Sequence, residues 1–465
     1  MNKEFYVFDA ISPLDFRYYG NNEQNFEKLN PYLSEKAFMR YQLKVEAVLT
    51  KIFAQYGICS QEIAKEIEQA CNKVSPQNIY EEEKRIKHNI RALVNCIRKE
   101  VSDKAKPFVH LSATSFDIFD TANSLRFKDF TKAVLLPDLI ELEKSLINVA
   151  KRESNTLQIG RTHGQHAVPI TFGYAIAEYV SRIGERILKI KRDVDNLKGK
   201  ISGAVGAYNS QGLFFERPDK FEKSVLAHLG LEPATHSTQI VQPEFLLDLI
   251  HSTISCMGII ANLADDLRHL QRSEIDEIAE KFDKEQVGSS TMPHKRNPWN
   301  FENIKSMWKQ VMPRINTIYI DQISEHQRDL SNSASSRFIP EIFAISIDSI
   351  NRMKRLIDKI IVNKKNMIKN FDISKDFIIA EPLYILLAFY GHPDAHETIR
   401  KLISKSYETN LSLKNIVNQD ETIKLYIKKL TQKQLEIINN PEQYIGICDK
   451  KTIEICQYWE DKISD

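Results

Sequence analysis

The feature that most constrains the fold is an apolar stripe with heptad spacing near the middle of the chain. It consists of aliphatic residues at alternating intervals of four and three positions: Ile176, Val180, Ile183, Ile187, Ile190, Val194 and Leu197. This spacing puts them all on one face of an α-helix, and charged residues such as Arg186 and Lys189 fall between them. Because a seam of this length needs partner helices to cover it, the sequence predicts a bundle of long helices.

A second stripe and the composition extend this prediction to the whole chain. The same spacing occurs earlier, at Leu135, Leu139, Leu142, Leu146 and Val149. Only 15 of the 465 residues are glycine, whereas roughly 7% is typical of proteins, and proline is sparse as well. Few turn-forming residues favour long uninterrupted helices over turn-rich sheets. The sequence therefore predicts an all-α fold.

The length predicts more than one domain, because a single core rarely grows beyond roughly 250 to 300 residues. A polar, histidine-containing stretch after Pro107 interrupts the first helical segment. After Val362 the chain becomes a series of shorter, lysine-rich amphipathic segments. We therefore predict an amino-terminal helical domain over residues 1–108, a central long-helix bundle over 109–362, and a small helical domain over 363–465.

Charge and cysteine content exclude several classes of protein. The 64 Lys and Arg residues nearly balance the 62 Asp and Glu residues, unlike the strongly basic domains that bind nucleic acids. The six cysteines are scattered without a CxxC pair, which predicts a reducing compartment rather than a disulfide framework. The amino terminus lacks the pattern of a signal peptide, and no run of 18 apolar residues occurs. We expect a cytoplasmic protein with no membrane span and no nucleic-acid partner.

Metal and cofactor motifs are also missing from the sequence. The 12 histidines include no HExxH pattern, and His163 with His166 have no carboxylate or cysteine at ligand spacing. Neither a dinucleotide-binding nor a phosphate-loop glycine pattern occurs. We predict no metal and no cofactor.

Three polar stretches stand out as places for chemistry, since loops between rigid helices often carry function. Residues 288–298 read GSSTMPHKRNP, within a predicted loop over 286–297. Residues 160–167 read GRTHGQHA and precede a helix expected to begin near Thr171. Residues 109–117 read VHLSATSFD, with hydroxyls where another helix is expected to start, which suits a carboxylate ligand. Taken singly, each stretch also has a plain structural reading as a turn, a helix entry or a cap.

Residues 288–298 match the GSSxMPxKxNP signature of the fumarase and aspartase superfamily in full. The three stretches in this order resemble the adenylosuccinate lyase family, and the resemblance covers essentially the whole chain. It implies a three-domain fumarase/aspartase-like fold and a cofactor-free β-elimination that releases fumarate from a succinylated purine nucleotide or its precursor. It also implies a homotetramer in which each active site draws on three subunits.

Four of the family's catalytic positions match residues in or near these stretches. By resemblance, Ser289 is the general base, His163 is the general acid for the leaving nitrogen, and Glu302 orients that histidine. Lys295 is a further catalytic residue, and Asn297 is an expected substrate ligand. Both have a chemical rationale of their own, because N–H donors complement a carboxylate on which a second negative charge develops. A serine hydroxyl is too weakly acidic for its spacing alone to mark it as a base, so that role comes from the family.

Further positions match the family's substrate contacts. His88 joins the predicted catalytic group, although the family's usual His-Asp pair here reads His88-Asn89. Without the Asp carboxylate, the His88 ring lacks a partner that fixes its tautomer. Because this change falls at a substrate-facing position, the sequence defines the reaction type better than it defines the substrate. The expected substrate-binding residues are Arg17, Tyr18, His110, Thr114, Ser115, Gln239, Asn297, Arg328, Ser333 and Arg337.

Two alternatives remain open at the level of sequence. A carboxymuconate cycloisomerase shares the signature but typically has no histidine at the position of His163, because it expels no amine. A non-catalytic scaffold of the same fold, such as some lens proteins, need not retain Ser289, Lys295 and His163 together. A related lyase acting on a different succinyl substrate also fits the pattern.

Overall fold

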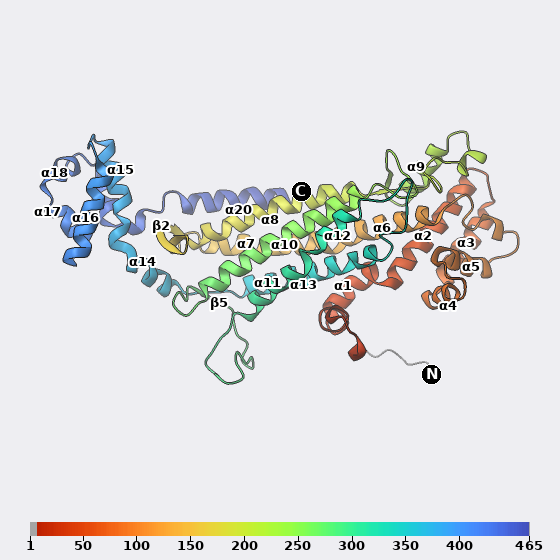
Figure 1. Cartoon of the computed structure of the whole chain (residues 1–465), viewed down its shortest axis with the longest axis horizontal. Coiled ribbons are helices and arrows are strands. Elements are labelled where there is room, and N and C mark those ends of the chain that lie inside the picture. Colours follow the sequence, from red (N-terminus) through yellow and green to blue (C-terminus); the bar gives the residue numbers. More distant parts are fainter. Residues whose placement is uncertain (1–6, 465) are drawn as a thin grey trace. The chain divides into compact units, whose positions relative to one another are not determined.

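The computed structural model describes residues 7–464 and consists almost entirely of helices (Figure 1). The prediction of an all-α fold is confirmed. Part of the amino-terminal segment that argued against a signal peptide, residues 1–6, lies outside the described residues. The first ten α-helices are α1 (Glu23–Leu33), α2 (Glu35–Gln55), α3 (Gln61–Lys73), α4 (Pro76–Ile86), α5 (Asn89–Lys99), α6 (Ser115–Phe130), α7 (Leu136–Arg152), α8 (Phe172–Asp195), α9 (Pro218–His228) and α10 (Glu244–Leu270).

The later part of the chain holds ten more helices. Across the chain, short strands form three small pairs. The helices are α11 (Trp299–Val311), α12 (Arg314–Ile320), α13 (Ile339–Asp358), α14 (Lys364–Ile378), α15 (Ala380–Phe389), α16 (Ala395–Thr409), α17 (Leu413–Gln419), α18 (Glu421–Ile427), α19 (Gln432–Asn439) and α20 (Cys448–Ser464). The strand pairs are antiparallel β1 (Leu157–Thr162) and β2 (Gln165–Thr171), parallel β3 (Lys198–Gly199) and β4 (Glu232–Pro233), and antiparallel β5 (Ile278–Ala279) and β6 (Ile361–Val362).

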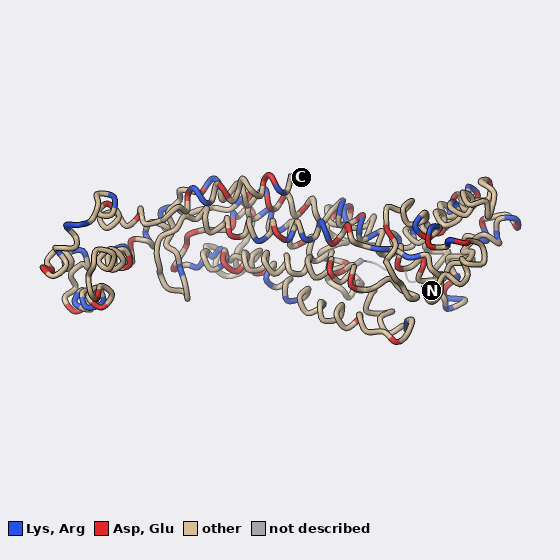
Figure 2. Tube along the Cα trace, turned by 90° about the horizontal axis from the view of Figure 1, so that it is seen from above, with Lys and Arg blue, Asp and Glu red and all other residues tan. Residues whose placement is uncertain are grey.

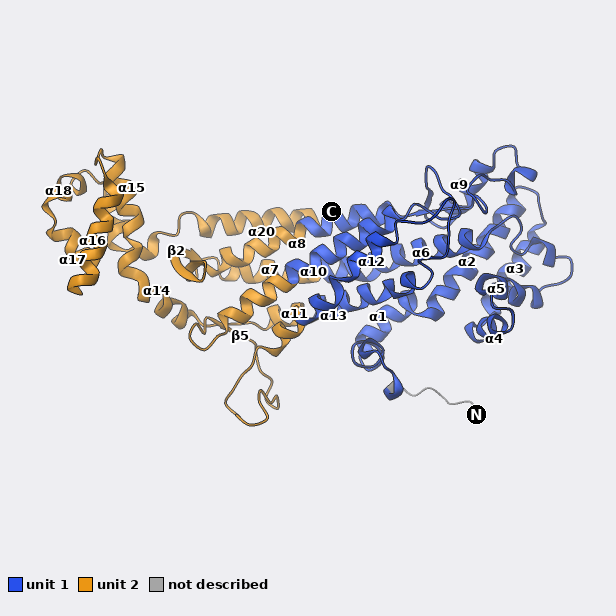
Figure 3. Ribbon diagram, in the orientation of Figure 1, with its two compact units in different colours: residues 1–140, 185–260, 306–351 blue, residues 141–184, 261–305, 352–465 orange. Residues whose placement is uncertain are grey.

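The chain divides into two compact units (Figure 3). Unit 1 contains residues 1–140, 185–260 and 306–351, and unit 2 contains residues 141–184, 261–305 and 352–465. Each unit is built from separated stretches of sequence. The division into three consecutive domains stays a prediction.

Serine caps define the first helices of unit 1. Ser34, Ser60 and Ser75 each accept a hydrogen bond from the backbone N–H three residues on, which begins α2, α3 and α4. Helices α2 and α3 are separated by a short turn, and Gly57, with φ of +76°, lies in it. The buried apolar core of this unit brings α2, α3 and α5 together with α6 and α9.

The heptad stripe behaves as its spacing predicts. Helix α8 begins at Phe172, next to the expected start near Thr171, and all seven stripe residues are buried. The earlier stripe lies on α7, where Leu139, Leu142, Leu146 and Val149 are buried. Burying such faces drives bundle formation in water.

Helix α10 is long and apolar enough to cross a membrane by length and composition. However, 61% of its most apolar window is buried within the protein, as expected for a helix of a protein core. Figure 2 shows basic and acidic residues interspersed along the chain, in agreement with its balanced charge. Within residues 7–464, no group of three or more potential metal ligands is gathered in one place.

Candidate active site

The signature residues lie on a loop of unit 2 that joins β5 to α11 and extends away from both elements (Figure 3). Glu280 closes the base of this loop. Its Oε1 accepts hydrogen bonds from the backbone N–H groups of Asn300 at 3.1 Å and Phe301 at 3.0 Å, and its Oε2 accepts one from Asn300 Nδ2 at 2.8 Å. These bonds satisfy free N–H donors at the start of α11 and fix where the loop ends.

The loop is folded against itself at its glycine. A Cβ atom on Gly288 would lie 2.1 Å from the carbonyl oxygen of Lys295, so no larger residue fits there without a shift of the backbone. Asn297 Nδ2 donates a hydrogen bond to the carbonyl oxygen of Gly288 at 2.9 Å. Gly288 and Asn297 therefore shape the loop that presents Ser289 and Lys295.

Ser289 has an environment suited to a negatively charged oxygen. Its Oγ accepts hydrogen bonds from the backbone N–H groups of Met292 at 3.1 Å and Thr291 at 3.4 Å. Donors aimed at an oxygen stabilise its deprotonated form. These contacts are compatible with the predicted role of Ser289 as a base, and that role stays a prediction.

His163 lies at the tip of the β1–β2 hairpin, which the sequence did not predict. His163 and Gly164 have φ of 55° and 73°, and positive φ at both central residues is the mark of a tight hairpin turn that matches strand twist. Gly160 allows the strands to pair closely, because a Cβ there would meet the carbonyl oxygen of Val168 at 2.5 Å. The His163 side chain is exposed at this tip.

A buried carboxylate holds the hairpin in place. Glu277, fully buried, accepts hydrogen bonds from Arg161 Nη2 at 2.6 Å and Gln158 Nε2 at 2.8 Å, both on β1. It also accepts one from Asn370 Nδ2 on α14 at 2.9 Å. The geometry of the hairpin that carries His163 therefore depends on Glu277.

Glu302, the predicted orienting carboxylate, is exposed in the first turn of α11. Over residues 7–464, no hydrogen bond joins Glu302 to His163 within one chain. Lys295 is exposed as well. The roles of these three residues stay predictions, and each side chain is open to contact by another molecule.

Unit 1 contains a cavity of about 560 Å³ that gathers six of the predicted site residues. These are His88, Ser115, Gln239, Arg328, Ser333 and Arg337. Ser115 is the first residue of α6, whose free N–H groups favour an anion. A cavity of this size accommodates a nucleotide-sized molecule.

Arg328 is the cation of this cavity with unused hydrogen-bonding capacity. Its guanidinium lies 5.2 Å from the ring centroid of Phe116, and one terminal nitrogen donates to Asn332 Oδ1. Its Nε and Nη1 atoms are buried and have no hydrogen-bond partner. Since unpaired buried donors are costly, these two atoms favour an acceptor group of a ligand.

Four other predicted residues of unit 1 lie outside the cavity lining. Arg17 and Tyr18 belong to the short helical turn η2 (Leu14–Gly20). Thr114 directly precedes α6, and its N–H donates to Asp117 Oδ2 at 2.9 Å. His110 Nδ1 lies 2.6 Å from Glu46 Oε1; burial lowers the pKa of His110, but the charge and hydrogen bond of Glu46 outweigh burial and raise it overall.

His88 caps the start of α5 through its ring. Its Nδ1 accepts a hydrogen bond from the backbone N–H of Arg91 at 3.2 Å, so the neutral ring carries its proton on Nε2. Asn89 accepts a hydrogen bond from the backbone N–H of Ile90 through its side chain at 2.7 Å. The tautomer of His88 is thus set by the helix cap, without the carboxylate that the family usually places next to it.

Asp120 is a cavity residue that sequence reasoning missed. It lines the cavity with Arg328 and accepts a hydrogen bond from the backbone N–H of Val241 at 2.9 Å. Burial raises the pKa of Asp120 to about 6. The signal in the sequence was its position three residues after Asp117, which puts two acidic side chains on neighbouring positions of one helix face.

We expect Asp120→Asn to stabilise the protein above neutral pH. Because the native pKa exceeds the ordinary value of 3.8, the stability due to protonated Asp120 is present at low pH and is lost as the pH rises through 6. The substitution should raise the free energy of unfolding by about 3 kcal/mol at pH 8 and by about half as much at pH 5, measured by urea titration. Asp372→Asn, at an exposed position, should change neither value; an equal effect of Asp120→Asn at both pH values would contradict this account.

Asp117 and Lys200 join two polar loops through a fully buried ion pair. Asp117 Oδ1 also accepts hydrogen bonds from the backbone N–H groups of Ser202 at 3.1 Å and Gly203 at 3.2 Å. The carbonyl oxygen of Ser112 accepts hydrogen bonds from Ser210 Oγ at 2.7 Å and Gln211 Nε2 at 2.9 Å. Residues 109–117 and 200–211 therefore form one fixed structure.

Comparison with known proteins agrees with this geometry. Residues 16–313 match the family model described as lyase, and residues 324–445 match the model described as adenylosuccinate lyase C-terminal. The chain is 35% identical to an adenylosuccinate lyase from Pyrococcus horikoshii, over 97% of this chain and 98% of that protein. The chain belongs to the adenylosuccinate lyase family. In this adenylosuccinate lyase family member, the site residues predicted from the sequence lie mainly in the signature loop, the His163 hairpin and the unit 1 cavity.

Two more distant similarities show how far the fold extends beyond adenylosuccinate lyases. The chain is 30% identical to an N-acetyl-S-(2-succino)cysteine lyase from Enterococcus italicus, over 92% of this chain and 93% of that protein. A 3-carboxy-cis,cis-muconate lactonizing enzyme from Pseudomonas putida superposes with a TM-score of 0.81 at 21% identity, covering 93% of this chain and 98% of that chain. At this identity the likeness is one of fold alone.

Proposed function

We propose that this protein is a carbon-nitrogen lyase that eliminates fumarate from adenylosuccinate to give AMP. We extend the proposal to the succinylated aminoimidazole carboxamide ribotide of purine biosynthesis. The observation that carries it is the intact signature loop, in which two backbone N–H groups donate to Ser289 Oγ, in a chain of this family. No cofactor enters the proposed reaction.

The first step removes a proton from the carbon next to a carboxylate of the succinyl group. Ser289 is the proposed base, because N–H donors to its Oγ favour the charged oxygen it needs. The electrons left on the carbon move into the neighbouring carboxylate, which gains a second negative charge. Lys295 supplies an ammonium group close in sequence to Ser289, and such donors stabilise a charge that develops in the transition state.

The second step breaks the bond between carbon and nitrogen. His163 is the proposed acid that gives its proton to the leaving nitrogen, and Glu302 is proposed to orient it. Asn297 and the backbone N–H groups of the loop complement the carboxylates of the departing fumarate. Fumarate and the amino form of the purine compound are the products, and the proton removed by Ser289 balances the one given by His163.

The nucleotide part of the substrate is proposed to bind in the unit 1 cavity. Arg328 offers two unpaired N–H donors, and the start of α6 at Ser115 favours an anionic or carbonyl oxygen. Arg337 and Ser333 add a second guanidinium and a hydroxyl to the wall. Arg17 and Tyr18 are proposed to contact the phosphate from the nearby η2 turn.

We propose a homotetramer with shared active sites. His163, Lys295 and Glu302 are exposed in the single chain, and a general acid and an oxyanion site work best when water is excluded. Helix α12 and the segment after it expose large apolar side chains, including Ile320 at 68% and Ile323 at 80%. Exposed apolar groups of this size are typical of protein interfaces.

We expect Ile320→Glu combined with Ile323→Glu to dissociate the tetramer, because charges placed in an apolar interface lose their hydration. Light scattering with size-exclusion chromatography should give the mass of four 53.8 kDa chains for the parent and one or two for the variant. Leu425→Glu, which adds a charge at an exposed aliphatic position on α18, is the control. A parent protein that runs as a monomer would contradict the proposal.

We place the protein in the cytoplasm. The six cysteines are all free thiols, and free thiols persist where the surroundings are reducing. The substrates proposed here are charged nucleotides, which do not cross membranes unaided.

The function is tested by comparing three succinyl substrates in one fumarate assay. Adenylosuccinate and the succinylated ribotide present a C–N bond, and N-acetyl-S-(2-succino)cysteine presents a C–S bond. The proposal expects kcat/KM for both C–N substrates to exceed that for the C–S substrate by at least about a hundredfold, since the cavity donors then contact a nucleotide. A preference for the C–S substrate would contradict the proposal. It would connect the replacement of the family's Asp by Asn89 with a different substrate specificity.

A further inference from the structure

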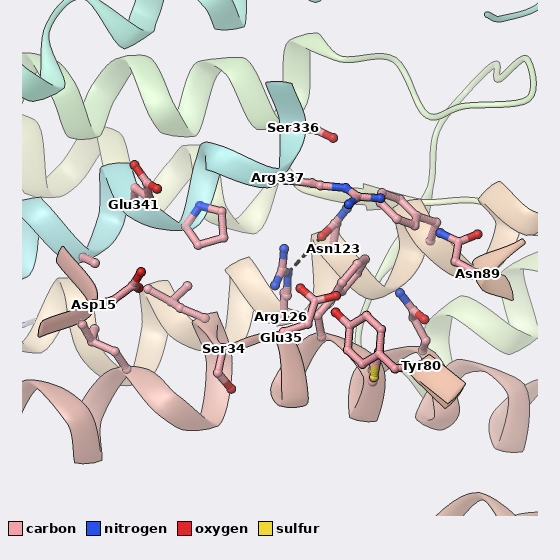
Figure 4. A pocket seen from close by; sticks show the side chains of 18 of the residues that line it. Asp15, Ser34, Glu35, Tyr80, Asn89, Asn123, Arg126, Ser336, Arg337 and Glu341 are labelled. Carbon is pink, nitrogen blue, oxygen red and sulfur yellow. Dashed lines mark hydrogen bonds between the residues drawn. The ribbon is translucent and has the colours of Figure 1, made fainter. Parts of the chain in front are cut away.

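A second cavity of unit 1 has no assigned ligand. It measures about 370 Å³ and lies among η2, α1, α2, α4, α6 and the start of α13 (Figure 4). It shares six lining residues with the larger cavity, and its other lining residues belong to it alone. The shared residues are Glu83, Asn89, Phe119, Asn123, Ser336 and Arg337. The predicted catalytic residues Ser289, His163, Lys295 and Glu302 do not line it.

The floor of this cavity contains a buried cation that makes no ion pair in the described part of the chain. Arg126 is 5% exposed, and its guanidinium contacts the rings of Phe38 and Phe127, 4.2 and 4.6 Å from their centroids. Its Nε donates to Asn123 Oδ1 at 2.9 Å. Within the described residues, no carboxylate lies within ion-pair distance of Arg126.

The hydrogen bond to Asn123 restricts how Arg126 can bind anything further. Because its Nε already donates to Asn123, the remaining donors of Arg126 lie on the edge of the guanidinium that carries the Nη groups. That edge presents parallel N–H donors whose geometry matches a carboxylate. Burial lowers the pKa of Arg126 to about 9, although the charge of Glu35 opposes this effect.

A second buried polar group lies on the same floor. Gln42 is 6% exposed, lines the cavity, and has no hydrogen bond to any described residue. The amide atoms of Gln42 are not among the fully buried polar atoms that lack a partner, so they are open to the cavity and free to bond a group within it. Gln42 and Arg126 together therefore offer donors to an acceptor group that the chain itself does not provide.

The rim is mainly acidic, although Arg337 also lines the cavity. Asp15 and Glu35 are exposed and Glu83 is half-buried, and all three line the cavity. Glu341 lines it too, but it is paired with Arg314 at 2.5 Å. A dianion such as phosphate or fumarate would meet these carboxylates on its way to Arg126, whereas a molecule with an ammonium group would be attracted to them.

We propose that this cavity is a second ligand site for a small zwitterion, whose carboxylate binds Arg126 and Gln42 and whose ammonium group binds the carboxylates of Glu35 and Glu83. The ligand class is that of a free amino acid. The predicted catalytic residues Ser289, His163, Lys295 and Glu302 do not line this site, although it shares one wall with the larger cavity.

Direct binding to the full-length protein tests the site. Isothermal titration would compare L-alanine, 3-aminopropanoate, 4-aminobutanoate and 5-aminopentanoate with propanoate and propylammonium, which each carry one charge. At least one zwitterion should bind about tenfold or more tightly than both single-charge probes, since each charge-assisted contact contributes about that factor. If no zwitterion binds at millimolar concentration, or if propanoate binds as well as the best of them, the proposal is wrong.

Variants assign the binding to this cavity. Gln42→Leu keeps the volume of the side chain and removes its donors, and Glu35→Gln removes one rim charge; each should weaken zwitterion binding about fivefold or more. Glu62→Gln, in the first turn of α3 and outside the cavity, is the matched control and should bind as the parent does. Unchanged binding in both cavity variants would overturn the assignment.

Competition separates this site from the substrate cavity. A saturating concentration of AMP should leave zwitterion binding unchanged, and displacement by AMP would place the zwitterion in the larger cavity and overturn the second site. Because the titration requires no turnover, its outcome is independent of whether the protein proves to be a lyase.

Discussion

Ser289→Ala is expected to lower kcat for fumarate release by about a thousandfold or more. The substitution removes the group proposed to take the carbon-bound proton, and general base catalysis alone contributes about 10² to 10⁴ to the rate. Substrate binding should be nearly unchanged, because the unit 1 cavity is not altered. The measurement is steady-state kinetics on adenylosuccinate together with direct binding of the substrate to the variant.

Ser290→Ala is the matched control for this experiment. Ser290 is the next residue of the same exposed loop, so its substitution reports any general effect of losing a hydroxyl there. It should change kcat by no more than about threefold. If the Ser289→Ala variant retained most of the parent activity, another residue would have to be the base.

The proposed sharing of active sites adds a distinctive expectation. Ser289→Ala and His163→Ala chains should each be inactive alone, but a mixture that has been dissociated and reassembled should regain part of the parent activity. Some sites of the mixed tetramer then receive an intact Ser289 from one chain and an intact His163 from another. Recovery would be absent if one chain supplied both residues to each site.

Lys200→Met is expected to destabilise the protein by about 3 to 5 kcal/mol. It leaves Asp117 buried without its counter-ion, and breaking a buried pair on one side carries a cost of this size. The loops over 109–117 and 200–211 should loosen together, so KM for adenylosuccinate should rise as well. Urea unfolding and steady-state kinetics measure the two effects.

A second substitution separates lost charge from lost packing. Adding Asp117→Asn to Lys200→Met removes the stranded charge but keeps an oxygen that accepts from Ser202 and Gly203. The double variant should therefore recover part of the lost stability. Arg217→Met, which breaks an exposed ion pair with Asp219, should cost less than about 1 kcal/mol. A Lys200→Met variant as stable as this control would contradict the account.

Local patterns allowed much of the fold to be predicted from the sequence. The heptad stripe marked α8 within a few residues, because side-chain spacing alone decides which face of a helix is apolar. The loop over 286–297 was marked by its glycine, proline and polar residues, and its signature indicated the superfamily. A helix start within residues 109–117 followed from the hydroxyls of that stretch, and α6 begins there at Ser115.

Features that depend on distant residues were not accessible in this way. The β1–β2 hairpin contains a His163-Gly164 turn rather than a common turn dipeptide, and its strands are held by Glu277, more than a hundred residues further on. The Asp117–Lys200 pair and the position of Asp120 beside Val241 likewise join separated segments. The spacing of residues along the chain does not predict which buried charges form pairs, because tertiary packing decides which of them lie close together.

The most direct test of the central claim is product analysis of the parent protein with adenylosuccinate. Chromatography of the reaction at successive times should show fumarate and AMP appearing in equal amounts as adenylosuccinate disappears, without any added metal or cofactor. If adenylosuccinate binds but remains intact while the protein is folded and tetrameric, the protein is not the lyase described here.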